Sequence, residues 1–456
     1  MAARLGQHAI VVGGSIAGLM AARVLTDFFD QVTVLERDEI ADRPAAHKSV
    51  PQANHLHALL LGGQQVLSSL YPDFTDRLQS LGAVRFRIGQ DVGFYTEKGK
   101  AYSPSGSVKE PRDLGSYGYS QSRGLLEYCL RQSTVELRNL KLRTQAQVQS
   151  LLCENGRVRG VRFGAAGAEE SLAADLVVDA GGRGSRAPRW LSDLGFQTPE
   201  ETIIGCDFAY SSAKFRKPAG YDAEPVMLCG GTPPKYTSGG GLAEIEDGLW
   251  MVSLGGRFGD YPPTDPEGFL AFAKAIPNPR LYDLIKNAER VTEISHHRFP
   301  TSVQRHYERL GAFPERFIVL GDAVSSFNPV YGQGMSSAAM QVRSLQQLLG
   351  ERAAGHGLDG LAASFFPKAA EVIATPWLLA GATDFVYPQT KGERPPGMDE
   401  GARYFAALDS IVAEDIEVHR LVNEVAQLAR PLWDLTSEPL RTRVLERQAQ
   451  LASSQS

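Results

Sequence analysis

A glycine-rich turn near the start of the chain constrains the fold more than any other feature. Residues 9–12 (Ala-Ile-Val-Val) form the apolar run of a buried strand, and Gly13 and Gly18 follow that run closely. The spacing then predicts a helix over residues 19–29 and a second strand over residues 31–36. A strand, a glycine turn, a helix and a second strand in this order predict a βαβ unit with parallel strands.

This βαβ unit has the residue pattern of a dinucleotide-binding fold. Gly13 permits a tight turn, Gly18 lets the helix pack against the strand, and the helix N-terminus offers free N–H groups to a pyrophosphate. Ser15 replaces the second glycine of the G-x-G-x-x-G pattern, but serine is small and its hydroxyl can bond a phosphate. Glu36 ends the second strand, where an acidic side chain accepts hydrogen bonds from the adenosine ribose. A parallel strand and helix that bind no ligand are the alternative interpretation.

The composition is that of a soluble globular protein. The chain has 456 residues, 43% hydrophobic and 22% charged, a length that accommodates two or three domains. Its net charge of -5 argues against the basic surface of a nucleic-acid-binding protein. No stretch reaches the roughly 18 apolar residues of a membrane span, and no signal-peptide core is present. The four cysteines form no C-x-x-C pair, which favours reduced thiols over disulfides or zinc. We expect a cytoplasmic protein.

Further patterns indicate a second sheet and a helical C-terminal region. The pair Asn155-Gly156 lies between two alternating segments and predicts a hairpin, while residues 175–180 and 317–322 predict buried strands. Residues 200–300 predict a mostly antiparallel sheet. From residue 360 onward the pattern is helical, with breaks expected at Pro376, Pro395-Pro396 and Pro431.

The predicted fold class is therefore α/β, with a Rossmann-like domain that other parts of the chain interrupt. We expect a mostly antiparallel β-sheet domain to be inserted into it and a helical region to follow. The predicted divisions are 1–75, 120–200 and 300–350 for the discontinuous nucleotide-binding domain, 76–119 and 201–299 for the β-sheet domain, and 351–456 for the C-terminal helical region.

Three motifs together resemble a known enzyme group. They are the glycine turn with Glu36, residues 175–186 (Asp-Leu-Val-Val-Asp-Ala-Gly-Gly-Arg-Gly-Ser-Arg) and residues 321–335 (Gly-Asp-Ala-Val-Ser-Ser-Phe-Asn-Pro-Val-Tyr-Gly-Gln-Gly-Met). With them the chain resembles the group A FAD-dependent monooxygenases, the superfamily of aromatic hydroxylases and squalene epoxidase. Residues 50–60 and 376–384 also resemble bacterial epoxidases that act on polyene precursors of polyethers. The resemblance implies an FAD-binding domain of the p-hydroxybenzoate hydroxylase (PHBH) type and a substrate-binding β-sheet domain.

The resemblance also implies which residues bind FAD. Asp322 would bond the ribityl chain, and the turn before Met335 would place N–H groups at the flavin pyrimidine edge. Arg123 would reach the phosphates, with a solvated arginine at a helix start as the alternative, and Arg37 would lie over the adenine or in solvent. The implied cofactor-binding residues are Gly13, Gly14, Ser15, Ala17, Gly18, Glu36, Arg37, Arg123, Val148, Gly321, Asp322, Pro329, Gly332, Gln333, Gly334 and Met335.

Two departures from related families affect the expected reaction. Gly181 stands where the second motif usually has an aspartate, which leaves open whether NAD(P)H or a separate flavin reductase supplies electrons. The W-x-W-x-I-P motif of the flavin-dependent halogenases is absent, because no two of the four tryptophans have that spacing. This absence argues against halogenation.

Other residues admit a functional and a structural interpretation. His55 and His57 suggest a metal, but no third ligand is evident, so a loop near the flavin or a helix start is favoured and we expect no metal. Arg183 and Arg186 are candidates for phosphate contacts or for surface charge. The candidates for a pocket wall, or simply for the core, are Phe208, Tyr210, Trp250 and Met251.

The implied function is a monooxygenase that uses FAD and O2, with NADPH or NADH as transient reductant. A flavin C4a-hydroperoxide would epoxidise an alkene of an apolar natural product, a polyketide or terpenoid, and no catalytic side chain is required. The alternatives are hydroxylation of an aromatic or indole-like ring, a reductase or desaturase of the geranylgeranyl reductase type, and an FAD-binding protein without enzymatic activity.

Overall fold

A five-stranded parallel sheet lies within the largest apolar core of the protein. The structure, a computed structural model, describes residues 4–45, 51–165 and 167–453, so Val50 of the segment 50–60 lies outside the described residues. The central strands are apolar runs buried on both faces, as parallel sheets require. The strand order is β19 (Phe317–Val319), β11 (Leu176–Asp179), β1 (Gly6–Val12), β2 (Phe29–Leu35) and β7 (Leu140–Arg143).

Helices cover both faces of this sheet and build its core. The first of them, α1, packs against α4 and α8, and α8 in turn packs against α2 and α9. The buried residues Leu19, Phe163 and Phe365 belong to one continuous apolar core. The helices are α1 (Ile16–Thr26), α2 (Leu61–Leu70), α3 (Phe74–Ser80), α4 (Arg123–Val135), α5 (Ala187–Asp193), α8 (Gly334–Ala353) and α9 (Leu361–Asp384).

The first helix differs at its ends from the expectation. It begins at Ile16 and ends at Thr26, whereas the prediction placed residues 27–29 in the helix. Phe29 instead begins β2, where it pairs with Gly6 of β1. The expected end was wrong because pairing with the neighbouring strand, which a helical pattern does not reveal, draws Phe29 into the sheet.

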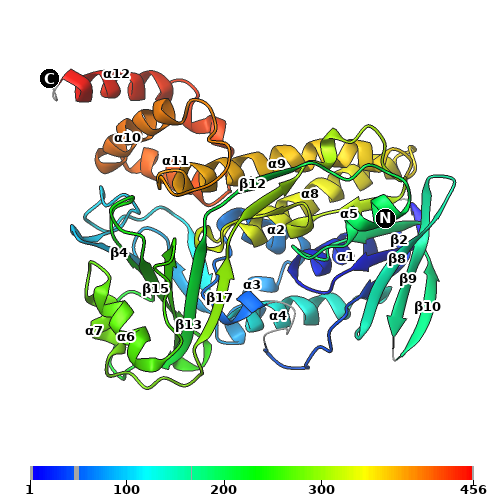
Figure 1. Cartoon of the computed structure of the whole chain (residues 1–456), viewed down its shortest axis with the longest axis horizontal. Helices are drawn as coiled ribbons and strands as arrows, with labels where there is room; N and C mark the ends of the chain where they lie inside the picture. The colour runs from blue at the N-terminus through cyan, green and yellow to red at the C-terminus, as the bar shows by residue number, and fades with distance from the viewer. Residues whose placement is uncertain (1–3, 46–50, 166, 454–456) are drawn as a thin grey trace.

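A three-stranded antiparallel sheet lies at one edge of the molecule, at the right of Figure 1. Asn155 and Gly156 both have positive φ angles, 50° and 72°, as a type I′ hairpin turn requires. The predicted hairpin is confirmed. The hairpin joins β8 (Ala146–Glu154) to β9 (Arg157–Ala165), and the third strand of the sheet is β10 (Ala168–Ala173).

The second large sheet has seven strands, all antiparallel neighbours except the parallel pair β14 and β4. Helices α6 (Pro266–Ala275) and α7 (Arg280–Ile285) pack on it, and Trp250 is fully buried in the core between them. The strand order is β17 (Ser295–Phe299), β13 (Phe208–Arg216), β16 (Leu249–Arg257), β15 (Gly239–Ile245), β14 (Val226–Gly230), β4 (Val92–Thr96) and β5 (Gly99–Ala101).

Short elements join these layers. The remaining strands are β3 (Val84–Arg87), β6 (Tyr117–Ser120), β12 (Glu201–Ile204), β18 (Ser302–Arg305) and β20 (Ser325–Ser326). The 3-10 turns are η1 (Pro51–Asn54), η2 (Glu246–Gly248), η3 (Tyr307–Arg309), η4 (Gly321–Ala323), η5 (Pro329–Tyr331) and η6 (Leu432–Leu435).

The chain ends in a helical region, which lies at the upper left of Figure 1. It contains α10 (Met398–Glu414), α11 (Ile416–Ala426) and α12 (Leu440–Ser453), which share a small apolar core. The predicted fold class, α/β with a mostly antiparallel second sheet and a helical C-terminal region, is confirmed. Among the described helices, none combines the length and the hydropathy that crossing a bilayer requires.

One expected helix break is absent. Helix α9 runs without interruption through Pro367 and Pro376, so the break predicted at Pro376 was wrong. A proline inside a helix costs about 3 kcal/mol, because it removes one hydrogen bond and crowds the preceding turn. The buried side chains of Phe365, Ala369 and Ile373 pack against the core along the same helix. Their burial offsets the cost of the prolines.

Candidate functional site

A cavity of about 420 Å³ opens where β1, β2 and β11 end. Ligands of open α/β sheets bind outside the carboxyl ends of the strands, where the strand order reverses. Here that reversal falls at β1, which has β2 on one side and β11 on the other. The start of α1, at Ser15 to Ala17, and the start of α8, at Gln333 to Met335, both line the cavity.

The glycine turn after β1 admits no larger residue at two positions. Gly13 has φ +101°, and a Cβ atom there would lie 2.6 Å from the carbonyl oxygen of Ala180. A Cβ atom at Gly18 would lie 1.9 Å from the carbonyl oxygen of Gly13. Because neither glycine has a side chain, α1 can lie close to β1. The first N–H groups of the helix then face the cavity, and no side chain caps them.

Glu36 joins the end of β2 to this turn. Its buried carboxylate accepts hydrogen bonds from the N–H groups of Gly14 at 2.7 Å and Asp38 at 2.9 Å. Glu36 also lines the cavity, next to the exposed Arg37. A carboxylate held in this way can still accept further hydrogen bonds, because each oxygen carries two lone pairs.

A buried charged pair on α4 lies behind the glycine turn. Ser122 caps α4, and Arg123 in its first turn forms an ion pair with Glu127 at 2.7 Å. The hydroxyl of Ser15 donates to Glu127 at 2.5 Å and accepts from Arg123 at 3.1 Å. Glu127 was not predicted as a site residue. The spacing of Arg123 and Glu127, four residues apart on one helix, is the signal that could have found it.

The segment before α8 supplies the opposite side of the cavity. Gly321 has φ +71°, and its N–H donates to the buried amide oxygen of Gln341 at 2.8 Å. Asp322 follows and faces the cavity, where burial raises the pKa of its carboxyl and the guanidinium groups of Arg123 and Arg183 act in the opposite direction.

Asp179 also lines the cavity, and it was not predicted as a site residue. It accepts hydrogen bonds from the N–H of Gly181 at 2.8 Å and from the hydroxyl of Ser185. Burial raises its pKa to about 6, although both hydrogen bonds favour the charged form. A Cβ atom at Gly181 would lie 2.8 Å from Oδ1 of Asp179. A side chain at position 181 would therefore compete for space with the carboxylate of Asp179.

Aromatic and imidazole side chains line the end of the cavity nearest the seven-stranded sheet. They include His57, Tyr210, His297 and Phe299. The Nδ1–H of His57 donates to the carbonyl oxygen of His55 at 2.8 Å, so Nε2 is the unprotonated acceptor. Burial, together with Arg123, lowers the pKa of His57 to about 4. His57 is therefore uncharged at neutral pH, whereas the guanidinium of Arg183 lies 4.7 Å from the centre of the Phe299 ring at the same end of the cavity.

His55 supports the wall instead of lining the cavity. Its ring lies 4.1 Å from that of Tyr210 in an edge-on arrangement, and Nδ1 lies 2.7 Å from the hydroxyl of Ser212. Burial lowers its pKa to about 3. No group of three or more potential metal-ligating side chains occurs among the residues that the structure describes.

The structure brings most of the predicted residues together around this cavity. Gly14, Gly18 and Gly321 do not line it and instead shape the turns beneath it. Trp250 and Met251 lie in the core of the second sheet, and Phe208 stacks on Tyr210 behind the cavity wall. The predicted residues that line the cavity are Gly13, Ser15, Ala17, Glu36, Arg37, Arg123, Val148, Asp322, Pro329, Gly332, Gln333, Gly334 and Met335.

Solved structures share this fold at low sequence identity. The flavoprotein/dehydrogenase of Cytophaga hutchinsonii has a TM-score of 0.69 and 15% identity, over 98% of this chain and 99% of its own. The flavin-dependent brominase Bmp2 has a TM-score of 0.67 and 15% identity, over 98% and 100%. The p-nitrophenol 4-monooxygenase PnpA of Pseudomonas putida has a TM-score of 0.64 and 16% identity, over 93% and 99%. The fold is therefore that of these flavin-dependent proteins.

A sequence relative is similar over most of both chains. No family model matches the chain. Protein Rv3254 of Mycobacterium tuberculosis is 34% identical over 409 residues, which cover 87% of this chain and 84% of the relative. The chain therefore belongs to the same family as Protein Rv3254.

Proposed function

We propose that the chain binds FAD in this cavity and acts as a monooxygenase. The observation that carries the proposal is that two helix N-termini, those of α1 and α8, open into one cavity that also holds Arg123. Helix N-termini and a guanidinium favour negative charge, which FAD carries on its diphosphate and, when reduced, on its flavin ring. The fold shared with flavin-dependent proteins supports the same cofactor.

The residues around the cavity fit the parts of this cofactor. The turn from Gly13 to Gly18 and Arg123 would hold the diphosphate, and Glu36 would accept from the adenosine ribose. Asp322 would bond the ribityl chain, and the first N–H groups of α8 would face the flavin. In this proposal the parallel sheet and its helices are the FAD-binding domain, and the seven-stranded sheet is the substrate-binding domain.

Bound FAD would supply the chemistry of electron acceptance from NADPH or NADH and of oxygen activation. The residues of this chain bind and orient the cofactor and the substrate, and they exclude water from the cavity. The N–H groups at the start of α8 stabilise negative charge, and the wall formed by Tyr210, His297 and Phe299 holds an uncharged substrate away from solvent. At neutral pH the three side chains of this wall are uncharged, because burial lowers the pKa of His297. This supports an alkene of a polyketide or terpenoid as the substrate, with an aromatic ring as the alternative.

The experiment that tests this function measures oxygen use and product mass together. The purified protein is reconstituted with FAD and supplied with NADPH, and candidate alkenes and aromatic compounds are added under oxygen. A monooxygenase consumes oxygen in proportion to substrate and adds one oxygen atom, as an epoxide or a hydroxyl group. Addition of two hydrogen atoms without oxygen consumption would instead establish a reductase of the geranylgeranyl reductase type.

A further inference from the structure

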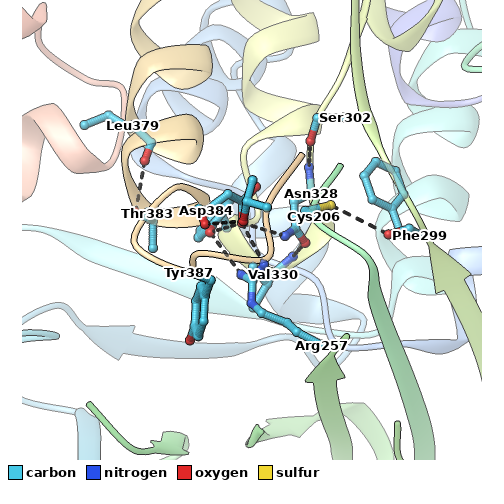
Figure 2. A network of polar contacts seen from close by, with 12 residues as sticks. Cys206, Arg257, Phe299, Ser302, Asn328, Val330, Leu379, Thr383, Asp384 and Tyr387 are labelled. Carbon is cyan, nitrogen blue, oxygen red and sulfur yellow. Dashed lines mark hydrogen bonds and ion pairs between the residues drawn. The ribbon is translucent and has the colours of Figure 1, made fainter. Parts of the chain in front are cut away.

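A buried network of polar side chains lies beneath the loop that leads into α8 (Figure 2). At its centre is Asp384, the last residue of α9, which is fully buried. Oδ1 of Asp384 forms an ion pair with Arg257 at 2.7 Å and accepts hydrogen bonds from the hydroxyl of Tyr331 at 2.5 Å and the amide of Asn328 at 3.1 Å. Arg257 also donates to the hydroxyl of Tyr331 at 3.1 Å.

The network joins three separate parts of the fold. Arg257 ends β16 of the seven-stranded sheet, Asp384 ends α9, and Asn328 and Tyr331 belong to the loop before α8. The same loop contributes Pro329 and the residues from Gly332 onward to the wall of the cavity. Asp384 therefore holds, from behind, the segment whose front faces the proposed flavin site.

Asn328 fixes the loop on both sides. Its N–H donates to the hydroxyl of Ser302 at 3.0 Å, and its side-chain oxygen accepts from the N–H of Val330 at 3.3 Å. The loop then turns at Gly332, which has φ +64°, and α8 begins two residues later. Because Asn328 and Tyr331 are both bonded to one carboxylate oxygen, the direction in which α8 starts depends on where Asp384 lies.

The network is poorly suited to stabilising the fold alone. Three donors converge on Oδ1, while Oδ2 has no hydrogen-bond partner in the described part of the chain. Burying an ion pair removes water from both charges, and an apolar replacement often stabilises a protein as well or better. The guanidinium of Arg257 also lies over the rings of Phe208 and Tyr387, at 5.4 and 4.9 Å from their centres. Such a directional arrangement favours one geometry of the loop.

We propose that Asp384 is a positioning residue that, through Tyr331 and Asn328, sets the start of α8 against the flavin. This inference rests on the proposed function, because it assigns the loop a role in binding FAD. The N–H groups at the start of α8 would set the electrostatic potential at the flavin. A displaced loop would therefore change the affinity for FAD and the reduction potential of the bound flavin.

The test compares Asp384→Asn and Tyr331→Phe with the unchanged protein. Glu244→Gln is the matched control, because Glu244 forms a partly buried ion pair with Lys217 in the second sheet, away from the cavity. Three quantities are measured: amide hydrogen exchange of residues 328–335 without FAD, the dissociation constant for FAD, and the midpoint potential of the bound flavin. Circular dichroism and thermal unfolding report whether each variant folds.

We expect both variants to exchange these amides faster and to bind FAD more weakly, by about tenfold for Asp384→Asn and about threefold for Tyr331→Phe. We also expect a shifted potential for both, and none of these changes for Glu244→Gln. A folded Asp384→Asn variant with unchanged exchange, affinity and potential overturns the inference. If Asp384→Asn does not fold, Tyr331→Phe decides by the same criteria. If the unchanged protein does not bind FAD, the proposed function fails, and the exchange rates alone still decide whether Asp384 orders the loop.

Discussion

At the scale of single residues, the glycine turn requires two positions without a side chain. Gly13 and Gly18, where an added Cβ would meet backbone atoms, differ from Gly311, where no atom lies within 4 Å of an added Cβ. At Gly18 an added Cβ would overlap the carbonyl oxygen of Gly13, so α1 would have to move away from β1. The position of the helix N-terminus at the cavity is therefore set by a single missing methyl group.

This contact predicts the effect of Gly18→Ala. The variant is expected to lose at least about 2 kcal/mol of unfolding free energy and at least about tenfold in FAD affinity, because backbone must shift to relieve the overlap. Urea denaturation and fluorescence titration with FAD measure both quantities. Gly311→Ala is the control, because Gly311 lies outside the cavity, and this variant is expected to match the unchanged protein. Equal behaviour of the two variants would contradict the assigned role of Gly18.

Asp179 predicts a dependence of stability on pH. Its pKa is about 6 in the folded protein against an ordinary value of 3.8, so the folded state holds the proton more tightly. The stability that this proton provides is complete below pH 3.8 and is lost as the pH rises through 6. Two pKa units correspond to about 2 to 3 kcal/mol.

The prediction is checked with Asp179→Asn, which cannot ionise. Relative to the unchanged protein, the variant is expected to gain about 2 to 3 kcal/mol of unfolding free energy between pH 4 and pH 8, as measured by urea denaturation at both values. The control Asp193→Asn removes an exposed carboxylate and is expected to show no such gain. A constant difference between Asp179→Asn and the unchanged protein would show that Asp179 does not titrate in this range.

At the scale of secondary-structure elements, local signals predicted most of the fold. The hairpin at Asn155-Gly156 and the buried strands followed from turn chemistry and apolar runs, because those signals lie within a few residues. The uninterrupted helix α9 did not follow, since Pro376 signals a break while the packing that sustains the helix comes from distant residues. Propensity is local, and tertiary packing overrode it here.

The prolines of α9 differ in their surroundings, and this predicts the result of a substitution. Pro367 is exposed, whereas Pro376 is buried. Pro367→Ala is expected to raise the unfolding free energy by about 1 to 2 kcal/mol, because the regained helix propensity exceeds the entropy that proline removes from the unfolded chain. Thermal and urea unfolding measure the change. A destabilised variant would mean that Pro367 has a role in packing that its exposure does not reveal.

At the scale of the whole molecule, the cavity is built by segments that lie far apart in the chain. The residues around Gly13, Glu36 and Asp322 could be predicted because each lies in a short motif, and Arg123 followed from the family resemblance. The buried pair of Arg257 and Asp384 could not, because the two residues are 127 positions apart and neither motif nor periodicity links them. Sequence patterns thus predicted residues that line the cavity, whereas the buried pair behind the loop before α8 depends on long-range packing.

The central claim is that this cavity holds FAD, and the visible spectrum of the purified protein tests it most directly. The spectrum is recorded after incubation with FAD and removal of the excess, and again after anaerobic addition of NADPH. We predict a flavin spectrum of one FAD per chain, which NADPH bleaches directly or after a candidate substrate or a flavin reductase is added. A protein that retains no flavin after incubation with FAD would contradict the claim and the monooxygenase function with it.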